Sequence, residues 1–332
     1  MRAGIIGATG YTGFELVKAV TRHKFFNLTL ITSESYAGKK ISEVYPALKG
    51  ICDMTLSDND MESASEKADM FFLCLPHKAS MKTAEYLYGK GKIVLDLSAD
   101  FRINDKALYE SVYGTEHTAP ALLEKAVYGH AEIFTQAIKK TNLVAVPGCY
   151  PTSIITPLYP LIENALIDTS FIIADSKSGV SGAGRKPSMT NSFCEVNEDF
   201  KPYGIFTHRH NAEIDHILSR AKEPCHAVFT PHLLPVNRGI LSTIYTKSSS
   251  DIELIKKTLA SYYKDRRLVR LHEDAPCLKW TVNTSFIDIA AYKRDDNLII
   301  VSVIDNLLKG ASGQALQCAN IIAGHNETEG LL

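Results

Sequence analysis

The residues Ala3-Gly4-Ile5-Ile6-Gly7-Ala8-Thr9-Gly10-Tyr11-Thr12-Gly13 decide the fold that this sequence predicts. A short apolar run leads into a glycine-rich loop, and the segment 12–21 then carries Leu16, Val17 and Val20 on one face. A strand, a loop of small residues and an amphipathic helix begin a β-α-β unit, in which the loop backbone can approach a pyrophosphate. The spacing is Gly-x-x-Gly-x-x-Gly rather than the more common Gly-x-Gly-x-x-Gly. We therefore expect a dinucleotide-binding domain at this end of the chain.

Beyond this motif, the pattern of apolar runs divides the chain in two. Through residue 147, short runs alternate with helical segments, as in a parallel sheet with crossover helices. Its predicted strands are 3–6, 28–31, 70–75, 93–97 and 143–146. The second half has longer, β-branched runs at 171–176, 226–229, 240–247, 280–290 and 298–304, which favour a mixed sheet, and helical periodicity at 214–221, 252–262 and 315–323. We therefore expect an α/β fold with a Rossmann-like domain followed by an α+β domain.

The end of the second predicted strand bears on the choice of dinucleotide. NAD-binding domains place an acidic residue there, whereas this stretch reads Ile31-Thr32-Ser33-Glu34-Ser35, with Lys39 and Lys40 following. Hydroxyls and lysines suit a 2′-phosphate, which favours NADP(H). A shift of two residues would make Glu34 the expected acid, so NAD stays the alternative.

Composition restricts the partners and the compartment. The 332 residues carry a formal net charge of -1, so no general basic surface attracts nucleic acid. The longest apolar runs are too short to span a bilayer, and we expect neither export nor membrane insertion. Seven widely spaced cysteines without a Cys-x-x-Cys pair predict free thiols in a reducing cytoplasm and no metal site.

One of these cysteines, Cys149, lies in an unusual turn, Val146-Pro147-Gly148-Cys149-Tyr150-Pro151-Thr152. A buried-type strand precedes it and a predicted helix follows, so the sulfur should lie near a helix N-terminus, which favours thiolate. A helix end contributes at most about 2 kcal/mol, whereas lowering a thiol pKa from about 8.5 to about 6 needs roughly 3.4 kcal/mol. A second group must therefore help. The other six cysteines are interpreted as structural: Cys52, Cys74, Cys194, Cys225, Cys277 and Cys318.

The candidate for that second group is the segment Thr207-His208-Arg209-His210-Asn211-Ala212-Glu213-Ile214. One of its histidines can pair with the thiol. The other histidine and Arg209 are then available to hold an anionic substrate, because a guanidinium forms two parallel hydrogen bonds to carboxylate or phosphate. Taken alone, the cluster also fits a solvated helix cap.

Together these motifs resemble N-acetyl-γ-glutamyl-phosphate reductase, of the type 1-like branch of the semialdehyde dehydrogenase superfamily. The resemblance extends over nearly the whole chain. Its most specific parts are Pro-Gly-Cys-Tyr-Pro-Thr at 147–152, Lys-Ser-Gly-Val-Ser-Gly-Ala-Gly-Arg at 177–185 and His-Arg-His-Asn-Ala-Glu-Ile at 208–214. Further matches lie at 75–77, 96–102 and 305–314. The resemblance implies reduction of N-acetylglutamyl phosphate by NADPH to N-acetylglutamate semialdehyde, a step of arginine biosynthesis.

The resemblance also implies domain limits and site residues. The NADP domain would span 1–147, the catalytic and dimerisation domain 148–305, and a C-terminal segment, 306–332, would return a helix to the first domain. Cys149 would be the nucleophile and His210 its base, while His208, Arg209 and Arg102 would contact substrate. His77 is interpreted as structural. The cofactor would contact Gly7, Thr9, Gly10, Thr12, Gly13, Ser33, Pro76, Ser178, Gly179, Ser181, Gly182 and Asn306.

Two of these implications have independent support, and two rival functions remain. A Ser/Gly-rich turn after the strand 171–176 would expose backbone N–H groups, and the amide of Asn306 can bind a carboxamide.

Aspartate-semialdehyde dehydrogenase is the nearest rival function, but the segment 238–246 lacks the histidine expected there. A non-catalytic NADP(H)-sensing module is the other. The resemblance implies a homodimer or homotetramer, and the acyl group on the substrate (acetyl, succinyl or a carrier protein) is left open.

Overall fold

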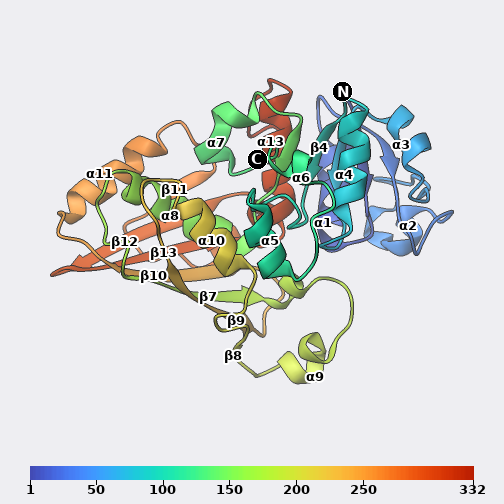
Figure 1. Ribbon diagram of the computed structural model, residues 1–332. Helices are drawn as coiled ribbons and strands as arrows, with labels where there is room; N and C mark the ends of the chain where they lie inside the picture. The colour runs from blue at the N-terminus through green and yellow to red at the C-terminus, as the bar shows by residue number, and fades with distance from the viewer. The chain divides into compact units, whose positions relative to one another are not determined.

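The computed structural model describes residues 1–332, apart from the side chain of Thr190. The chain forms two compact units (Figure 1). The first unit comprises Met1–Pro147 and Ala311–Leu332, and the second comprises Gly148–Gly310. Residues 306–310, which the sequence assigned to the C-terminal segment, lie in the second unit.

The first unit is built on a six-stranded parallel sheet with the order β2-β1-β3-β4-β6-β5. The first two strands flank α1 (Tyr11–Thr21), as the β-α-β pattern predicts. β5 is only two residues long, too short for the apolar pattern to reveal. The strands are β1 (Arg2–Ile6), β2 (Asn27–Ile31), β3 (Met70–Leu73), β4 (Ile93–Asp96), β5 (Val127–Tyr128) and β6 (Leu143–Ala145).

Three helices from distant parts of the sequence share the main core of the first unit. α1 contributes Leu16 and Val17, α7 (Ala131–Ile138) contributes Ile138, and α13 (Gly313–Ile322) contributes Leu316 among others. The return of α13 to the first unit agrees with the periodicity at 315–323. The remaining helices of this unit are α2 (Ile41–Val44), α3 (Met61–Lys67), α4 (Ser80–Gly89), α5 (Lys106–Tyr113) and α6 (Pro120–Leu123).

The second unit is built on a seven-stranded mixed sheet with the order β11-β12-β13-β10-β7-β9-β8. Its central pairs are antiparallel, while β7 with β9 and β11 with β12 are parallel. The mixed sheet predicted for this half is confirmed. Its strands are β7 (Ile172–Gly179), β8 (Lys201–Pro202), β9 (Ala227–Leu234), β10 (Ile240–Lys247), β11 (Val269–Leu271), β12 (Ile287–Arg294) and β13 (Asn297–Ile304).

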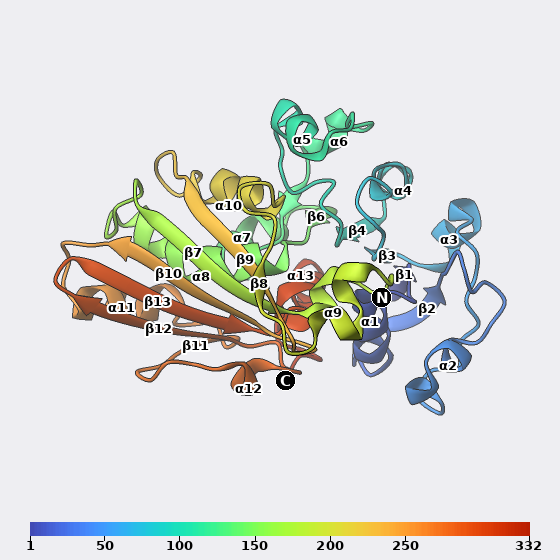
Figure 2. The same cartoon turned by 90° about the horizontal axis from the view of Figure 1, so that it is seen from below.

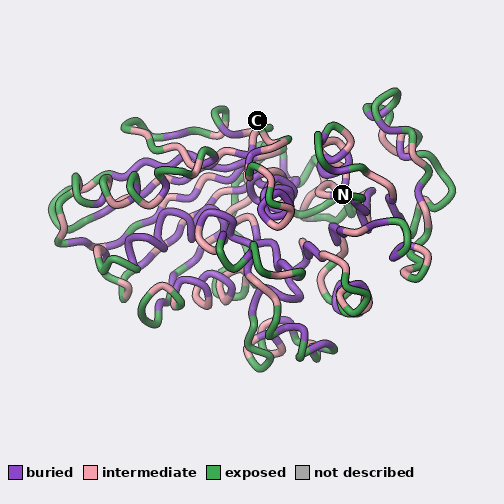
Figure 3. The backbone as a smooth tube through the Cα atoms, turned by 90° about the horizontal axis from the view of Figure 1, so that it is seen from above, coloured by how far each residue is buried: buried purple, intermediate pink, exposed green. Residues whose placement is uncertain are grey.

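Three helices lie on one face of this sheet: α8 (Cys149–Glu163), α10 (His210–Leu218) and α11 (Ile252–Tyr262). Figure 2 shows the opposite face, on which the strands lie in front of these helices. Figure 3 shows that buried residues run through the interior, whereas exposed residues lie mainly in the outer turns, loops and helix surfaces. α9 (Phe193–Val196) and α12 (Leu278–Thr281) are single-turn helices in the connections.

One of the two prolines inside α8 is accommodated by a side chain from outside the helix. Pro160 has no N–H to donate to the carbonyl of Thr156, four residues earlier. The buried hydroxyl of Tyr263, at the end of α11, donates to that carbonyl instead. The helix therefore continues through Pro157 and Pro160 without an unsatisfied Thr156 carbonyl.

One predicted strand is wrong in its first half. Residues 280–290 were expected to be extended, but α12 occupies the beginning of this range and β12 starts only at Ile287. Between them, Asn283 has a left-handed φ of 66°, and its N–H donates to the buried carboxylate of Asp305 at 2.8 Å. This tertiary contact produces a turn where the local pattern reads as strand. Among the described residues, no helix is both long and apolar enough to cross a membrane.

Candidate active site

The glycine loop, residues 7–13, connects β1 to α1 and needs glycine for steric reasons. Gly7 has a φ of 83°, a left-handed conformation that side chains disfavour. A Cβ on Gly13 would lie 2.4 Å from the carbonyl oxygen of Gly7, so α1 packs directly on the loop backbone. Gly10 differs, because a Cβ there would come no nearer than 3.7 Å to the atoms around it. Steric contacts within the chain therefore do not explain the glycine at position 10.

Hydroxyl groups fix this loop to the end of β2. Thr9 and Ser33 share a hydrogen bond of 2.9 Å between their hydroxyls, and the Tyr45 hydroxyl donates to the Thr9 carbonyl at 2.8 Å. The N–H of Gly7 donates to the Thr32 hydroxyl at 3.3 Å. The N-cap residue Gly10 has no side chain to cap α1, so the first N–H groups of the helix remain for an anion.

The end of β2 carries a hydroxyl where an NAD-specific domain would carry an acid. Ser33 is buried beside Thr9, while Glu34, Lys39 and Lys40 are exposed. Glu34 therefore does not occupy the buried position at the strand end. Thr12 lies near Cys74, just after β3: burial raises the pKa of the Cys74 thiol to about 12, and the nearby Thr12 side chain partly offsets that rise.

In the second unit, Cys149 is the first residue of α8, as the turn around it predicts. The backbone there is held from two sides. Glu213, fully buried on α10, accepts the N–H of Gly148 at 2.8 Å. On the other side, a Cβ on Gly310 would lie 2.8 Å from the Cβ of Cys149, so only glycine permits this approach. The position of the thiol is therefore fixed by the tertiary structure.

The two histidines lie beside this thiol turn, residues 148–152. The ring of Tyr150 makes edge contacts with His208 and His210 at centroid distances of 5.7 and 5.9 Å. His210 begins α10, one turn before Glu213, which holds the residue preceding Cys149. The structure thus brings the turn that contains Cys149 beside His208 and His210, about 60 residues later in the sequence.

His208 is electrically neutral at pH 7. Burial, reinforced by the charge of neighbouring Arg209, lowers the pKa of His208 to about 4. Its Nδ1 accepts the N–H of His210 at 3.1 Å, so the proton of the neutral ring lies on Nε2. His208 can therefore donate a hydrogen bond to an anionic substrate, but it carries no positive charge that would attract that substrate. Arg209 is exposed.

Two tyrosines, the buried Tyr150 and the exposed Tyr203, complete this side of the turn. The hydroxyls of Tyr150 and Tyr203 are 3.1 Å apart, and that of Tyr150 donates to the carbonyl of His232 at 3.2 Å. Burial raises the pKa of Tyr203 to about 12 and also raises the pKa of Tyr150. Both hydroxyls therefore keep their protons at neutral pH and remain hydrogen-bond donors.

The predicted second cofactor loop is assembled, although differently from expectation. β7 continues to Gly179, and the N–H groups of Gly179, Val180 and Ser181 donate to carbonyls of the segment 236–239 at 2.9 to 3.0 Å. The expectation that this turn exposes those N–H groups is therefore wrong, because the loop 236–239 extends the pairing. Ser178, Ser181 and Gly182 nevertheless cluster around Asn306.

Asn306 itself is held within this cluster. Its Oδ1 accepts the N–H of Gly239 at 2.8 Å, and its Nδ2 donates to the Ser181 hydroxyl at 3.0 Å. One hydrogen of Nδ2 remains for a further acceptor.

Arg102 and His77 have protein partners in the first unit. Arg102 is buried, and its guanidinium donates to the carbonyls of Val146 and Leu97 at 2.8 and 2.9 Å. His77 accepts the N–H of Ala99 through Nδ1 at 2.9 Å. Pro76, in the connection after β3, is exposed. Substrate contact by Arg102 and cofactor contact by Pro76 stay predictions.

The other cysteines differ from Cys149 in their surroundings. Cys52, Cys225 and Cys318 are buried, Cys74 is partly buried, and Cys194 and Cys277 are exposed. The interpretation of these six cysteines as structural stays a prediction. Among the described residues, no cluster of three or more His, Cys, Asp or Glu side chains is placed to hold a metal ion.

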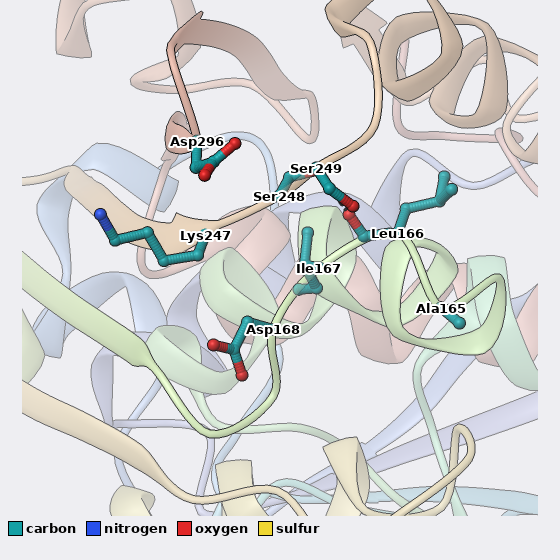
Figure 4. A pocket seen from close by; sticks show the side chains of 8 residues that line it. All are labelled: Ala165, Leu166, Ile167, Asp168, Lys247, Ser248, Ser249 and Asp296. Atoms are coloured by element: carbon teal, nitrogen blue, oxygen red, sulfur yellow. Dashed lines mark hydrogen bonds between the residues drawn. The ribbon is translucent and has the colours of Figure 1, made fainter.

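A separate hollow in the second unit lies away from the candidate site. Figure 4 shows this pocket of about 440 Å³ around Lys247. Lys247 ends β10, whereas Ile240, at the opposite end of that strand, pairs with Ser178 and Ile304 near Asn306. Eight residues of strand separate the two regions by roughly 23 Å. The lining residues are Ala165, Leu166, Ile167, Asp168, Lys247, Ser248, Ser249 and Asp296.

The residues that support the thiol turn were not assigned by the sequence. Glu213 stood within the quoted histidine motif, and its spacing of three from His210 places both on one face of a helix. That spacing was the available signal. Tyr203 and Gly310 carried no comparable signal, since only the tertiary structure brings them to Cys149 and Tyr150.

Comparison with known families agrees with this division of the chain. Residues 2–141 match the family described as semialdehyde dehydrogenase, NAD binding domain. Residues 149–306 match the family described as semialdehyde dehydrogenase, dimerisation domain.

Relatives of known name match over the full chain. N-acetyl-gamma-glutamyl-phosphate reductase from Desulforapulum autotrophicum is 47% identical, with 100% of this chain and 98% of the relative covered. The protein of the same name from Pelotomaculum thermopropionicum is also 47% identical, with 100% and 97% covered.

Solved structures are similar in fold. Aspartate semialdehyde dehydrogenase II from Vibrio cholerae superposes with a TM-score of 0.74 over 97% of this chain and 98% of that one, at 17% identity. Aspartate semialdehyde dehydrogenase with NADP from Candida albicans gives a TM-score of 0.72 over 97% and 98%, at 16% identity. At these identities the likeness concerns the fold alone.

Proposed function

The chain belongs to the N-acetyl-gamma-glutamyl-phosphate reductase family, and from this premise we propose that it reduces N-acetyl-γ-glutamyl phosphate to N-acetylglutamate 5-semialdehyde and phosphate. The observation that carries the proposal is the arrangement of Cys149. This thiol begins α8, and the backbone just before it is held by Glu213, on the same helix as His210.

The glycine loop fits NADPH as the reductant. The absence of a Cβ at Gly10 leaves space for a ligand, although no steric contact within the chain requires glycine there. The uncapped start of α1 offers N–H groups to the pyrophosphate. Thr9, Thr12, Gly7 and Gly13 would form the rest of this cradle. Bound NADPH supplies the hydride that reduces the acyl group.

Discrimination between the two dinucleotides would depend on Ser33. Its hydroxyl, with Lys39 and Lys40 nearby in sequence, suits a 2′-phosphate better than a free 2′-hydroxyl. Ser178, Ser181, Gly182 and Asn306 would contact the nicotinamide end, and the remaining Nδ2 hydrogen of Asn306 would donate there. Gly179 would contribute by its close packing, because a Cβ there would lie 2.7 Å from the Asn237 carbonyl oxygen.

The chemical role of Cys149 follows from its position. His210 accepts the thiol proton, and the thiolate sulfur attacks the γ-carbonyl carbon of the acyl phosphate. The carbon–oxygen bond to phosphate then breaks and leaves a thioester on Cys149. Once the acyl group is reduced, the alkoxide oxygen takes the proton that His210 holds. The resulting thiohemiacetal returns this hydroxyl proton to His210 as the carbon–sulfur bond breaks, the electron pair stays on the sulfur as thiolate, and the aldehyde departs.

The start of α8 would stabilise the charge that develops on the carbonyl oxygen. Pro151 has no N–H, and the N–H of Thr152 is used within the helix by the Gly148 carbonyl at 2.9 Å. The N–H of Tyr150 would then be a donor of the first turn to an oxyanion hole. Arg209, which is exposed and charged, would hold the phosphate or carboxylate, assisted by the Nε2–H of neutral His208.

We extend the proposal to assembly and location. The match of residues 149–306 to a dimerisation domain supports a homodimer or homotetramer. Light scattering of the purified chain would measure this directly. A cytoplasmic location is proposed from the seven cysteines, which form no disulfide among the described residues.

The deciding experiment is phosphate-dependent reduction of NADP by the purified protein, run in the reverse direction on a panel of semialdehydes. N-acetylglutamate semialdehyde is expected to be the best substrate, ahead of its N-succinyl analogue and of aspartate semialdehyde. Mass spectrometry of the acid-quenched protein should find the acyl group on Cys149. Faster turnover of aspartate semialdehyde, or an acyl group on another cysteine, would refute the proposal.

A further inference from the structure

The connection from β3 to α4, residues 74–79, lies directly against the glycine loop. The N–H of Cys74 donates to the Ile6 carbonyl at 2.8 Å, and a Cβ on Gly7 would lie 2.5 Å from the carbonyl oxygen of Cys74. Both segments follow parallel strands at the carboxyl edge of the sheet. The chain order reverses between β1 and β3, which is where open α/β sheets bind their ligands. The shape of residues 74–79 therefore forms part of the dinucleotide site that the proposed function requires.

This connection has a conformation that its own residues do not favour. Lys78 has a φ of 72°, in the left-handed region, where residues with a Cβ are disfavoured. Ala79, the N-cap residue of α4, has no side chain able to cap the helix. Bonds from elsewhere in the fold must maintain both features.

The buried carboxylate of Asp100, in the connection after β4, supplies these bonds. Its Oδ1 accepts the N–H of Lys78 at 2.7 Å, and its Oδ2 accepts the N–H of Ser80, the first residue of α4, at 3.0 Å. Oδ1 also accepts the hydroxyl of Tyr109 at 3.1 Å, which orients the carboxylate. Asp100 has no solvent exposure, so these bonds are made without competition from water.

The neighbours of Asp100 strengthen the same link. Asp96 accepts the Ser80 hydroxyl at 2.6 Å, and Ala99 donates to Nδ1 of His77 at 2.9 Å. The connection after β4 is therefore hydrogen-bonded to residues 77–80 at several points. A serine or aspartate at position 79 would cap α4 equally well, but it would not fix this connection relative to β4.

We propose that Asp100 is a positioning residue for the dinucleotide. It holds residues 74–79 in the shape that presents them, beside the glycine loop, to the bound cofactor. This inference rests on the proposed function. It differs from a purely structural role because loss of the carboxylate should weaken NADPH binding selectively.

The test compares Asp100→Ala and Asp100→Asn with the matched control Asp105→Asn. Asp105 caps α5 by accepting the N–H of Leu108 at 3.0 Å, a local bond that leaves residues 74–79 untouched. The Kd of NADPH would be measured by fluorescence without acyl phosphate, together with Tm and both KM values. Asparagine keeps one acceptor for Lys78 but turns its NH₂ group towards the Ser80 N–H, so this variant should fold and be partly defective.

We expect the Kd of NADPH to rise about tenfold in Asp100→Ala and about fivefold in Asp100→Asn, with the KM of the acyl phosphate within twofold of wild type. Asp105→Asn keeps an oxygen that can accept the Leu108 N–H, so it should change neither Tm nor the Kd of NADPH appreciably. If Asp100→Asn binds NADPH within twofold of wild type, or raises both KM values equally, the inference is wrong. If the wild-type protein itself fails to bind NADPH, the proposed function fails instead.

Discussion

The starts of α1 and α8 have the same local design but are held in place differently. Both helices begin with a glycine N-cap, which leaves first-turn N–H groups for another partner. At α1, the surrounding loop is fixed by backbone contacts and hydroxyls, such as the bond between Thr9 and Ser33. At α8, a fully buried carboxylate on another helix, Glu213, holds the residue before the thiol.

This difference matches what each helix start has to do. A dinucleotide spreads its contacts over many backbone groups, so small residues that permit close approach suffice at α1. A nucleophile must be placed to within a fraction of an ångström, which requires a partner that fixes a single backbone position. Substitutions at the α1 start should therefore change cofactor affinity, and those at the α8 start should change turnover.

The largest effect is expected from Cys149→Ala. Without the sulfur no thioester forms, and turnover should fall by about 10³-fold or more, while NADPH binding stays within twofold of wild type. Steady-state kinetics and a fluorescence titration would measure the two quantities. Retention of more than a tenth of the activity would contradict the thioester mechanism.

A matched pair of glycine substitutions separates packing from ligand space at α1. In Gly13→Ala the new Cβ meets the Gly7 carbonyl at 2.4 Å, and we expect a loss of about 2–3 kcal/mol of stability. In Gly10→Ala the nearest atom is 3.7 Å away, so Tm should change little while the Kd of NADPH rises about tenfold. Thermal unfolding with and without NADPH distinguishes the two. Equal losses of Tm would show that Gly10 also serves packing.

Glu213→Gln and Glu213→Ala test how the α8 start is held. The glutamine oxygen can still accept the Gly148 N–H, whereas alanine leaves it buried without that partner, at a cost of about 1–3 kcal/mol. We expect kcat to fall further in the alanine variant, with little change in the Kd of NADPH. A change confined to NADPH affinity would remove the distinction between the two helix starts.

The smallest effect at neutral pH is expected at His208. Its pKa is about 4 in the folded protein and about 6.5 in the unfolded chain, so neither state binds the proton above pH 7. As the pH falls from about 6.5 to 4, the unfolded chain takes up a proton that the folded protein does not, and stability decreases by at most about 3 kcal/mol. Denaturant unfolding of His208→Gln should show a shallower decrease over that range. An unchanged slope would mean that His208 titrates normally in the fold.

Much of the fold was predictable because its strands and helices carry strong local signals. The first sheet was identified from the pattern of β1, the glycine loop and α1. In the second unit, the predicted ranges match β10 (Ile240–Lys247) and α11 (Ile252–Tyr262). The failures occurred where a tertiary contact outweighs local preference. The chain turns at Asn283 because Asp305 accepts its N–H, and the local sequence of residues 280–290 does not predict that contact.

The candidate site was predictable in its principal groups but not in their support. The turn around Cys149 and the histidine motif were visible in sequence, and the fold brings them together. The bonds of Ser181 were misjudged because the segment 236–239 pairs with the loop, which requires knowledge of the sheet order. The neutrality of His208 depends on burial, which a sequence does not give.

The composition of the first unit from two distant stretches of chain has a consequence for synthesis on the ribosome. Its main core includes five residues of α13, namely Ala315, Leu316, Cys318, Ala319 and Ile321. Domains usually fold as units while translation proceeds from the N-terminus. Here residues 1–147 are made first but cannot complete their core without α13. Residues 148–310 can complete the second unit before α13 has been made. The core of the first unit therefore stays incomplete during translation until residues 311–322 have been made.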